Sequence, residues 1–511
     1  MVRTPVPSLP STVPDVEITS SVRRGAPIAL LTVPFDAEGD TTPVNGDSAR
    51  SAHGTPLPES ARPAGVVTGK AGEIHPLRGA TRWLLGLGAD QADANNWRAA
   101  GAALVRAINA DLAAHDDAGS TAPDTVQVEL PGDVEPGCVT GFVLGVCLGG
   151  YQLTVTEQEQ SPRLATVRLV VGDDRLAELT DVAAAARQLA EATSLARDLA
   201  NTPSNVKNPD WLASIISDVL ADVRCLDVEV RDQDWLTANG FGGILAVGGG
   251  SASEPRLIEI GYRPKGATRT LLLVGKGITF DTGGISLKPS EGMHLMRTDM
   301  SGAAAVAGAM RAIAQRGVDV AVTALIPAAE NHVSGSAYRP GDVVRHYGGK
   351  TTEIGNTDAE GRIVLADAMA YGVERFAPDA IVDVATLTGA MKVALGLRTG
   401  GFFATTDELA DALRAAGERV GETWWRMPLL AEHEEAVRGQ LADVKQTPDG
   451  PGGITAALFL REFTGGLPWA HLDIAGPARA DKTYNEVTPG GTGFAARTLV
   501  EFAAAYARVA P

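Results

Sequence analysis

The arrangement of apolar and polar positions along the chain predicts alternating strands and helices. In the first third it predicts strands at 27–34, 125–130 and 165–171, and helices at 97–114 and, interrupted by glycines, at 138–153. Residues 1–25 are rich in Pro, Ser and Thr and are expected to form a loose tail, and the polar stretch 36–69 is expected to form a long loop. This alternation favours an α/β domain.

An Ala-rich stretch over 180–200 has the pattern of a long helix and marks the expected domain boundary. Beyond it the pattern predicts strands at 270–274, 318–325, 380–384 and 469–474, and helices at 302–316 and 363–376. We therefore expect an α/β protein of two domains: a smaller N-terminal α/β domain over 1–178, and a larger C-terminal α/β domain over 179–511 that begins with the connecting helix. A central mixed sheet flanked by helices is expected in the larger domain.

The charge and composition of the chain argue against some classes of binding partner. The 511-residue chain carries a formal net charge of −18, which repels nucleic-acid phosphates and anionic lipid and argues against binding to either. Its three cysteines form no CxxC pattern, and no apolar run has the length of a signal peptide or a membrane span. We therefore expect a soluble cytoplasmic protein that does not bind membranes.

One Gly-rich segment, VGKGITFDTGGISLKPSEGMHLMRTDM at 274–300, gathers four charged residues: Lys276, Asp281, Lys288 and Asp299. Lys276 directly follows a predicted strand, and ligands of α/β proteins collect at the carboxyl ends of strands. The DTGG turn at 281–284 lets the backbone approach a bound group closely. The segment is therefore a candidate binding site.

A second cluster, DAEGR at 358–362, places two carboxylates two positions apart. In an extended chain Asp358 and Glu360 would point to the same side, and they would repel each other unless a cation lay between them. Arg362 is suited to hold an anion beside such cations because it keeps its charge. Taken alone, each of these residues is more simply explained by a solvated turn or a surface ion pair, and only the combination of the two clusters indicates a site.

Together the clusters provide three aspartates, one glutamate and two lysines. Oxygen ligands of this kind suit Mn²⁺, Mg²⁺ or Zn²⁺, and two ions about 3.5–4 Å apart lower the pKa of a shared water, which then supplies hydroxide for attack on a carbonyl. The sequence has no HExxH, GxSxG or Walker A motif, and the GGGS stretch at 248–251 lacks the lysine of a specific phosphate loop. Of the histidines, His294 is expected at the surface and His471 in the core.

The motifs VGKGITFDTGG, DM at 299–300 and NTDAEGR at 356–362 resemble the leucyl aminopeptidases, a family of hexameric two-metal exopeptidases. The resemblance extends over roughly 180–500 and includes ARDL at 196–199, AEN at 329–331 and ATLTGA at 385–390. The first 175 residues carry no matching motif. Thr282, where serine is common in the family, and Ser301, where glycine is common, are small departures at positions that are not ligands.

The resemblance assigns five metal ligands. Asp281 and Glu360 would bridge two divalent ions, Mn²⁺ or Zn²⁺, and Asp358 would bind the first ion. Lys276 and Asp299 would complete the second. A lysine ligand must bind as the neutral amine, so the ions have to depress its pKa strongly.

The resemblance also assigns catalytic and substrate-binding roles. Lys288 would polarise the scissile carbonyl and stabilise the oxyanion. Arg362 would hold a bicarbonate ion that acts as general base toward the bridging water, and the backbone amide near Leu387 would help to hold it. The pocket for the first side chain of the substrate would be lined by Met296, Thr386 and Gly389.

A metal-dependent aminopeptidase is thus implied, one that hydrolyses the N-terminal residue, preferably leucine or another apolar residue, from peptide substrates. A homohexamer built as a dimer of trimers is implied as well. Two alternatives are left open. One is a Cys-Gly-type dipeptidase with the same site, and the other is a non-enzymatic DNA-binding role, against which the net charge argues.

Overall fold

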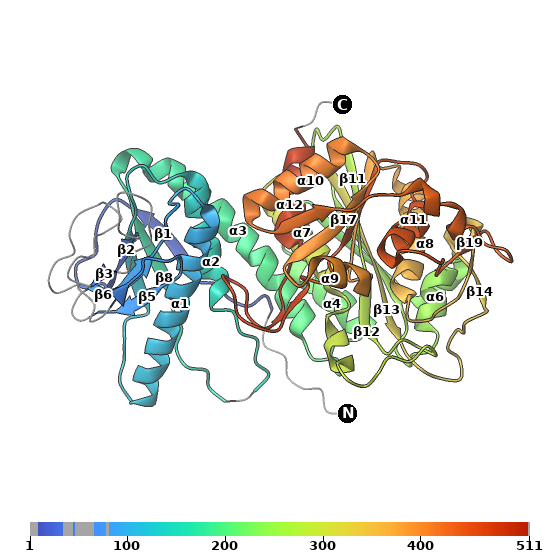
Figure 1. The fold of residues 1–511 in the computed structure, drawn as a ribbon, viewed down its shortest axis with the longest axis horizontal. Coiled ribbons are helices and arrows are strands. Elements are labelled where there is room, and N and C mark those ends of the chain that lie inside the picture. The colour runs from blue at the N-terminus through green and yellow to red at the C-terminus, as the bar shows by residue number, and fades with distance from the viewer. Residues whose placement is uncertain (1–8, 34–43, 46–65, 78–80, 157, 509–511) are drawn as a thin grey trace. The chain divides into compact units, whose positions relative to one another are not determined.

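The computed structural model describes residues 9–33, 44–45, 66–77, 81–156 and 158–508 (Figure 1). The chain forms two compact units. The smaller unit comprises Thr12–Glu191 with Asp481–Pro489, and the larger comprises Met1–Ser11, Ala192–Ala480 and Gly490–Pro511. Helix α3 (Leu176–Asn201) runs from the smaller unit into the larger, and the boundary predicted between residues 178 and 179 lies inside this helix.

A six-stranded sheet forms the centre of the smaller unit. Its order is β1 (Asp15–Thr19), β8 (Thr166–Val170), β7 (Thr125–Glu129), β2 (Ile28–Thr32), β6 (Thr81–Gly86) and β5 (Ile74–Pro76). The β5–β6 pair is antiparallel and the other pairs are parallel. The loose tail predicted for residues 1–25 is wrong for β1, because its DVEIT sequence alternates polar and apolar residues and pairs with β8 along its length. Most of the long loop predicted at 36–69 lies outside the described residues.

Two helices of the smaller unit, α1 (Ala94–Asp117) and α2 (Pro136–Gly149), approach each other closely. Gly141, Gly145 and Gly149 recur at every fourth residue of α2, so they lie on one face. A Cβ at these positions would fall 2.3, 2.2 and 2.5 Å from the nearest backbone atom of α1. The predicted break in this helix is therefore wrong, since the glycines bring the two backbones together without interrupting α2.

The larger unit is organised around a nine-stranded sheet. Its order is β18 (Thr423–Arg426), β17 (Thr399–Ala404), β20 (Trp469–Asp473), β16 (Ala380–Ala385), β11 (Thr270–Gly275), β13 (Ala321–Asn331), β10 (Arg256–Tyr262) and β9 (Leu226–Arg231), and β12 (Gly277–Asp281) pairs with β13 beyond the end of β11. The strands from β20 to β13 are parallel, whereas β17 joins β20, and β10 joins β13 and β9, in antiparallel pairs. The predicted α/β fold class with a mixed central sheet is confirmed.

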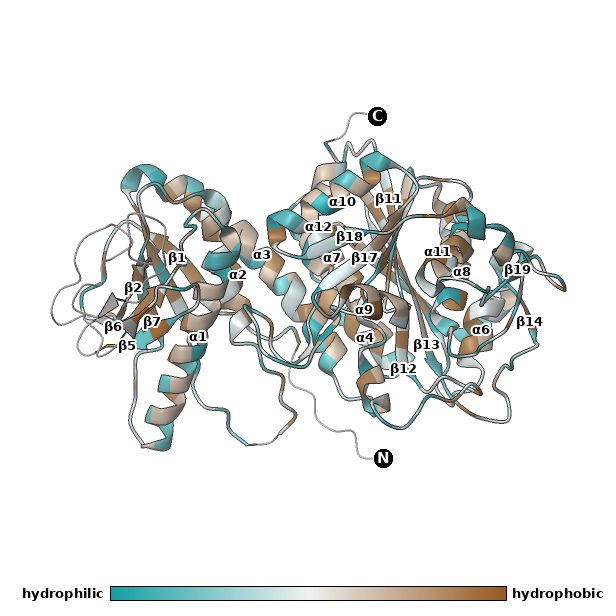
Figure 2. Cartoon of the chain, viewed as in Figure 1, coloured by the Kyte–Doolittle hydropathy of each residue, from teal (hydrophilic) through white to brown (hydrophobic). Residues whose placement is uncertain are grey.

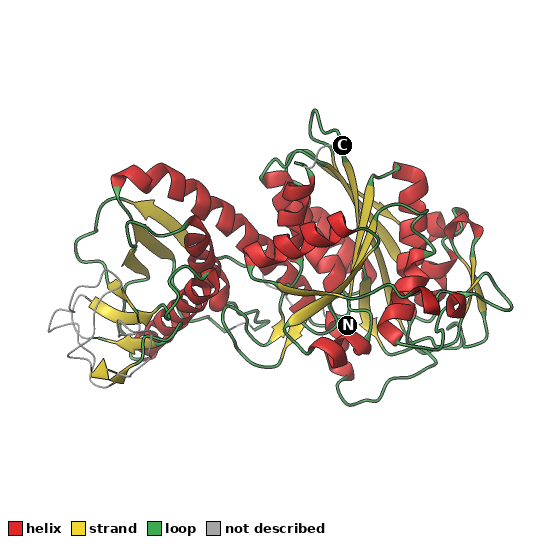
Figure 3. Cartoon of the chain, turned by 45° about the horizontal axis from the view of Figure 1, so that its top comes forward, coloured by secondary structure: helices red, strands yellow, loops and turns green. Residues whose placement is uncertain are grey.

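Helices cover both faces of this sheet (Figure 3). Helices α7 (Ser301–Gln315) and α12 (Ala496–Tyr506) lie on one face, and α8 (Glu360–Phe376) and α6 (Gly242–Gly248) lie on the other (Figure 1). Because the central strands are covered on both faces, β11 and β16 are nearly continuous apolar runs, TLLLVG and AIVDVA. The labelled strand β11 appears brown in Figure 2.

A separate three-stranded sheet lies in the same unit. It consists of β14 (Val343–Arg345), β15 (Thr351–Glu353) and β19 (Val444–Lys445), and β15 and β19 are parallel. The sheet brings the residues after β15 and β19 side by side, and the residues after β15 lead into the NTDAEGR segment. Within the described part of the chain, no helix has both the length and the apolar character needed to cross a membrane.

Candidate metal centre

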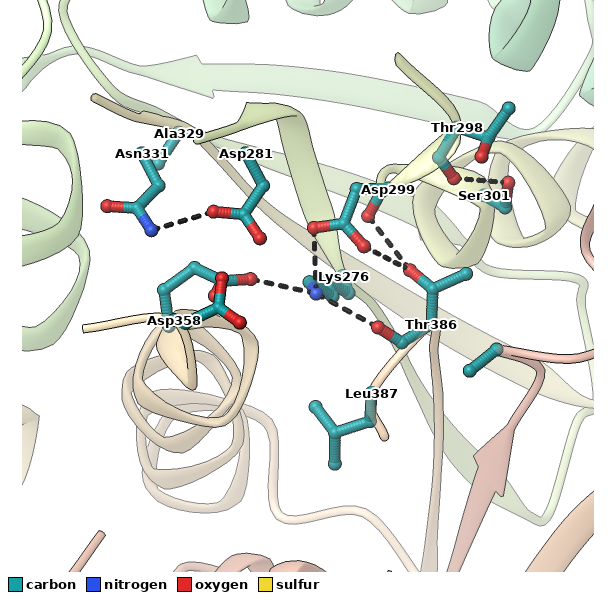
Figure 4. Close-up of polar contacts among 12 residues, drawn as sticks. Lys276, Asp281, Thr298, Asp299, Ser301, Ala329, Asn331, Asp358, Thr386 and Leu387 are labelled. Carbon is teal, nitrogen blue, oxygen red and sulfur yellow. Dashed lines mark hydrogen bonds and ion pairs between the residues drawn. The ribbon is translucent and has the colours of Figure 1, made fainter. Parts of the chain in front are cut away.

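The carboxyl ends of the central parallel strands gather the first cluster. Lys276 lies between β11 and β12, Asp281 ends β12 and Thr386 directly follows β16. Because β16, β11 and β13 are parallel neighbours and β12 continues along β13, these side chains meet at one edge of the sheet. Figure 4 shows Asp281, Asp299, Asp358 and Thr386 around the end of Lys276.

The second cluster is not an extended segment. Asp358 lies in a turn in which its backbone N–H donates to Oδ1 of Asn356 over 2.9 Å, and Glu360 is the first residue of α8. One carboxylate oxygen each from Asp281, Asp358 and Glu360 nevertheless lies within 4.8 Å of the other two. The extended conformation predicted for this segment is therefore wrong, although the carboxylates do converge.

Lys276 is enclosed by the acidic residues of the site. Its Nζ lies 2.9 Å from Asp299 Oδ2 and 2.8 Å from Glu360 Oε1, and it donates to the Thr386 carbonyl over 3.0 Å. Burial opposes a charge on Lys276, but the carboxylates of Asp299 and Glu360 outweigh this effect and raise its pKa above the ordinary value. The amine is therefore charged in the metal-free protein and must lose a proton to become a metal ligand.

Lys288 pairs with the other two carboxylates. Its Nζ lies 2.7 Å from Asp281 Oδ2 and also forms an ion pair with Asp358. The loop that carries Lys288 turns at Gly283, whose φ of +88° favours glycine, and the backbone N–H of Lys288 then donates to the Thr282 carbonyl over 2.9 Å. The Lys288 side chain is 21% exposed, against 4% for Lys276, so it is the lysine of the pair that a substrate can reach.

The donor set fits divalent cations. Four carboxylates, which are buried or half-buried, face only two ammonium groups. Burial raises the pKa of Asp299 to about 8, and Oε2 of Glu360 is buried without a hydrogen-bond partner. Crowded carboxylates of this kind repel each other, and cations between them relieve the repulsion and complete the coordination of the buried oxygens.

Asn331 joins the two clusters, a role that the sequence did not predict. It ends β13 and is buried, and its Nδ2 donates to Asp281 Oδ1 over 2.8 Å and to the Thr357 carbonyl over 3.0 Å. Thr386 acts in a similar way on the other side of the site, since its Oγ1 donates to Asp299 Oδ1 over 2.8 Å. The AEN motif indicated the family at Asn331, but a sequence motif does not show which atoms meet.

A buried lysine outside the clusters holds the segment that carries Asp299. Lys207 Nζ donates to the carbonyls of Leu199, Ala200 and Arg297 over 2.7, 2.9 and 2.7 Å. Its side chain is fully buried, so these bonds tie the end of α3 to the 3₁₀ helix η4 (Met293–Thr298), which directly precedes Asp299. Lys207 is a lone lysine in a loop, and no sequence pattern predicts this role.

Arg362 has an N–H group without an acceptor that could bind an anion, whereas the backbone N–H of Leu387 already has one. Arg362 is buried in the first turn of α8, where its Nη1 donates to the Gln446 carbonyl over 2.7 Å and its Nε has no hydrogen-bond partner. Burial lowers the pKa of Arg362 to about 10, so the guanidinium is charged at neutral pH. The backbone N–H of Leu387, which the resemblance assigns to bicarbonate, instead donates to Asp473 Oδ1 over 3.1 Å.

The three residues predicted to line the substrate pocket lie on two segments. Met296 belongs to η4, and its carbonyl accepts the backbone N–H of Asp299 over 3.1 Å. Thr386 contacts the side chain of the same aspartate. Gly389 begins α9 (Gly389–Leu395) and is exposed, and a Cβ there would meet no atom within 4 Å. The structure thus brings Met296 and Thr386 together at Asp299 and leaves open space at Gly389.

The remaining histidine and loop predictions concern residues that are not proposed ligands. His294 is exposed and His471 is buried in β20, as predicted. The Nδ1 of His471 lies 2.6 Å from Asp383 Oδ1, its register partner on β16. The apolar run before the GGGS stretch forms helix α6, whereas a phosphate loop of the Walker type would follow a strand.

Comparison with known proteins identifies the family. Residues 194–500 match the catalytic domain of the cytosol aminopeptidase family. The chain is 42% identical over 503 residues to a probable cytosol aminopeptidase of Cutibacterium acnes, with 96% of each protein covered. It is 40% identical over 450 residues to a probable cytosol aminopeptidase of Chlorobium limicola, with 85% of this chain and 88% of that protein covered.

Two solved structures are similar to nearly the whole chain. The bottromycin maturation enzyme BotP is similar with a TM-score of 0.78 and 36% sequence identity, over 97% of this chain and 100% of that chain. BotP in complex with Mn is similar with the same TM-score of 0.78 and 37% identity, over 95% of this chain and 100% of that chain. The chain therefore belongs to the cytosol aminopeptidase family and is a hydrolase of the aminopeptidase class.

Proposed function

We propose that the protein is a metal-dependent aminopeptidase that removes the N-terminal residue, preferably leucine or another apolar residue, from peptides. The observation that carries this proposal is the convergence of oxygens from Asp281, Asp358 and Glu360 within 4.8 Å, beside Lys276 and Asp299. Two divalent ions held there would lower the pKa of a water and so supply hydroxide for attack on the scissile carbonyl.

The chain's own residues would hold these ions in two groups. Asp281 and Glu360 would be shared, Asp358 would serve one ion, and Lys276 with Asp299 would serve the other. Lys276 would give up its proton on binding, since only the neutral amine has a free electron pair. The complex of BotP with Mn supports Mn²⁺ as the first ion to test, and Zn²⁺ is the alternative.

Lys288 would act on the substrate. In the metal-free protein its ammonium group is neutralised by Asp281 and Asp358. Divalent ions on those carboxylates would weaken both ion pairs, and the charged, partly exposed amine would then stabilise the oxyanion that develops on the scissile carbonyl.

Arg362 would hold an anionic general base, for which bicarbonate is the candidate. Its partnerless Nε supports this role, because a buried guanidinium N–H without an acceptor favours an anion. Leu387 would contribute its backbone amide only by sharing the hydrogen that it now donates to Asp473. Arg362 is therefore the main holder of the anion in this proposal.

Removal of a single N-terminal residue follows from the need for a free amine. Only a chain that begins at the site presents an amine to the cations and to the carboxylate of Asp299. The side chain of that first residue would lie near Met296, Thr386 and Gly389. An apolar pocket there would favour leucine, although each methylene contributes only about 1–3 kcal/mol of discrimination.

The proposal is tested by a substrate panel with Mn²⁺ present. We expect turnover of leucine p-nitroanilide and of leucine-initiated peptides of several lengths, and none of N-acetyl-leucine p-nitroanilide, which has no free amine. Turnover of the acetylated substrate would reject the exopeptidase mechanism. Turnover of Cys-Gly without turnover of longer peptides would favour the dipeptidase.

We further propose a homohexamer, arranged as a dimer of trimers, because the hexameric state is implied by the family resemblance of the catalytic motifs. Light scattering of the purified protein would return about six times the mass of one 52.9 kDa chain. A monomer mass would reject this assembly.

A further inference from the structure

Gln446 is a fully buried glutamine that directly follows β19. Because β19 pairs in parallel with β15, and the Gln446 N–H donates to the Glu353 carbonyl over 3.0 Å, the residue lies beside the chain that leaves β15. That chain is the turn 355–359, which contains Asp358 and leads to Glu360. The small sheet thus brings Gln446 next to the segment that carries two of the proposed metal ligands.

Both ends of the Gln446 amide bind this turn. Oε1 accepts the backbone N–H groups of Gly355 and Asn356, each over 3.0 Å, and Nε2 donates to the carbonyl of Ala359 over 3.1 Å. The oxygen and the nitrogen of the amide cannot exchange places, because the two backbone N–H groups require an acceptor and the Ala359 carbonyl requires a donor. The side chain therefore holds the turn at its beginning and at its end.

The backbone of Gln446 reaches a third point of the site. Its carbonyl accepts a hydrogen bond from Nη1 of Arg362 over 2.7 Å, and Nε of the same guanidinium has no hydrogen-bond partner. Ala359 lies between Asp358 and Glu360, and Arg362 follows in the first turn of α8. Gln446 is thus hydrogen-bonded to the chain before Asp358, to Ala359 between Asp358 and Glu360, and to the side chain of Arg362.

We propose that Gln446 is a positioning residue of the active site, which fixes Asp358 and Glu360 for cation binding and orients Arg362 for its anion. It touches no reacting atom and acts through the residues that do. A neutral amide suits this task because a carboxylate in its place would add charge beside Glu360 and would lose the donor to Ala359. The proposal rests on the proposed metal-dependent function.

The test compares Gln446→Met, which keeps the length of the side chain but has no amide, with Gln440→Met, an exposed glutamine in the preceding loop. The measurements are the Mn²⁺ dissociation constant by competition with a chelating dye, and kcat and KM for leucine p-nitroanilide at saturating Mn²⁺. We expect Gln446→Met to weaken Mn²⁺ binding about 10- to 100-fold and to lower kcat with little change in KM. Equal values for the two variants would overturn the proposal.

Two further measurements separate positioning from a general structural role. Gln446→Glu keeps both acceptor bonds and should bind Mn²⁺ more tightly than Gln446→Met if the bonds to Gly355 and Asn356 matter; the reverse order would count against the proposal. In the wild-type protein, the amide hydrogens of Gly355 and Asn356 should exchange slowly with solvent, because Oε1 accepts both. Rapid exchange would overturn the proposal even if neither variant folds.

The Mn²⁺-binding measurements distinguish failure of the proposed function from failure of the proposed role of Gln446. If the wild-type protein binds no Mn²⁺ and no Zn²⁺, the proposed function is rejected. If it binds Mn²⁺ and Gln446→Met binds it equally well, only the role of Gln446 is rejected.

Discussion

Asn331 and Asp281 are register partners at the ends of β13 and β12, and Asn331 Nδ2 donates to Asp281 Oδ1 over 2.8 Å. A proposed bridging ligand is thus held by an amide from the neighbouring strand of the same sheet. The other Nδ2 hydrogen binds the Thr357 carbonyl, so this asparagine also fixes the turn before Asp358. The geometry of the metal centre therefore depends on residues that are not ligands themselves.

The substitution Asn331→Leu removes both bonds while keeping a similar side-chain volume. Asp281 would then be free to rotate, and we expect the Mn²⁺ dissociation constant to rise about 10- to 100-fold, as measured by dye competition. Asn331→Asp also removes both donated bonds, but its repulsion with Asp281 in the metal-free protein would be relieved by a bound cation, so we expect a smaller loss of Mn²⁺ affinity than for Asn331→Leu. Unchanged Mn²⁺ affinity in Asn331→Leu would show that this contact does not position Asp281.

Gly361 makes room for Lys276, and Gly361→Ala should displace it. The added Cβ would lie 2.6 Å from Lys276 Cε and 2.8 Å from its Nζ, so the amine would have to move away from Glu360. Misplacement of a catalytic group by about 1 Å costs about 100-fold in rate, and we expect a fall of this order in kcat/KM for leucine p-nitroanilide.

The matched control for this change is Gly137→Ala in helix α2, where a Cβ would meet no atom within 4 Å. We expect this variant to retain wild-type kcat/KM. Wild-type activity of Gly361→Ala would mean that the position of Lys276 is not important for turnover.

His471 and Asp383 form a buried pair whose stability contribution depends on pH. Burial opposes a charge on His471, but the carboxylate of Asp383 outweighs it and raises the pKa of the imidazole. A raised folded-state pKa gives a stabilisation that is fully present below the unfolded-state pKa of about 6.5 and is lost as the pH rises through the folded-state value.

The measurement for this pair is the melting temperature of the wild-type protein and of His471→Gln across the range from below pH 6.5 to above it. We expect the advantage of the wild-type protein to be largest at the acidic end and to shrink as the pH rises. An advantage that stays constant or grows with pH would contradict a charged His471 in the folded state.

The sequence predicted the central sheet well where strands are buried on both faces. The runs 270–274 and 380–384 are apolar except for Thr270 and Asp383, and they form β11 and β16 within one residue of the predicted bounds. Prediction from the sequence failed where one local pattern is compatible with two structures. The glycines of α2 resemble helix breakers in sequence, but in the folded protein they face a second helix, and only the packing reveals this.

The site was predicted in the same uneven way. The acidic and basic residues of the two clusters are recognisable from their types and from the family motifs, and the structure brings Lys276, Asp281, Asp299, Asp358 and Glu360 together. The supporting residues Asn331, Lys207 and Gln446 are ordinary polar residues far from the clusters in sequence. Their roles depend on which strands are neighbours, and no local pattern contains that information.

The most direct test of the account is a titration of the metal-free protein with Mn²⁺, during which leucine p-nitroanilide hydrolysis is followed against the number of ions added per chain. We predict no turnover before metal is added, a rise that is complete at two ions per chain, and no turnover at any Mn²⁺ concentration in a Glu360→Gln variant, because that residue would be shared by both ions. Full activity of the metal-free protein, or a rise that is complete at one ion, would contradict the two-metal site.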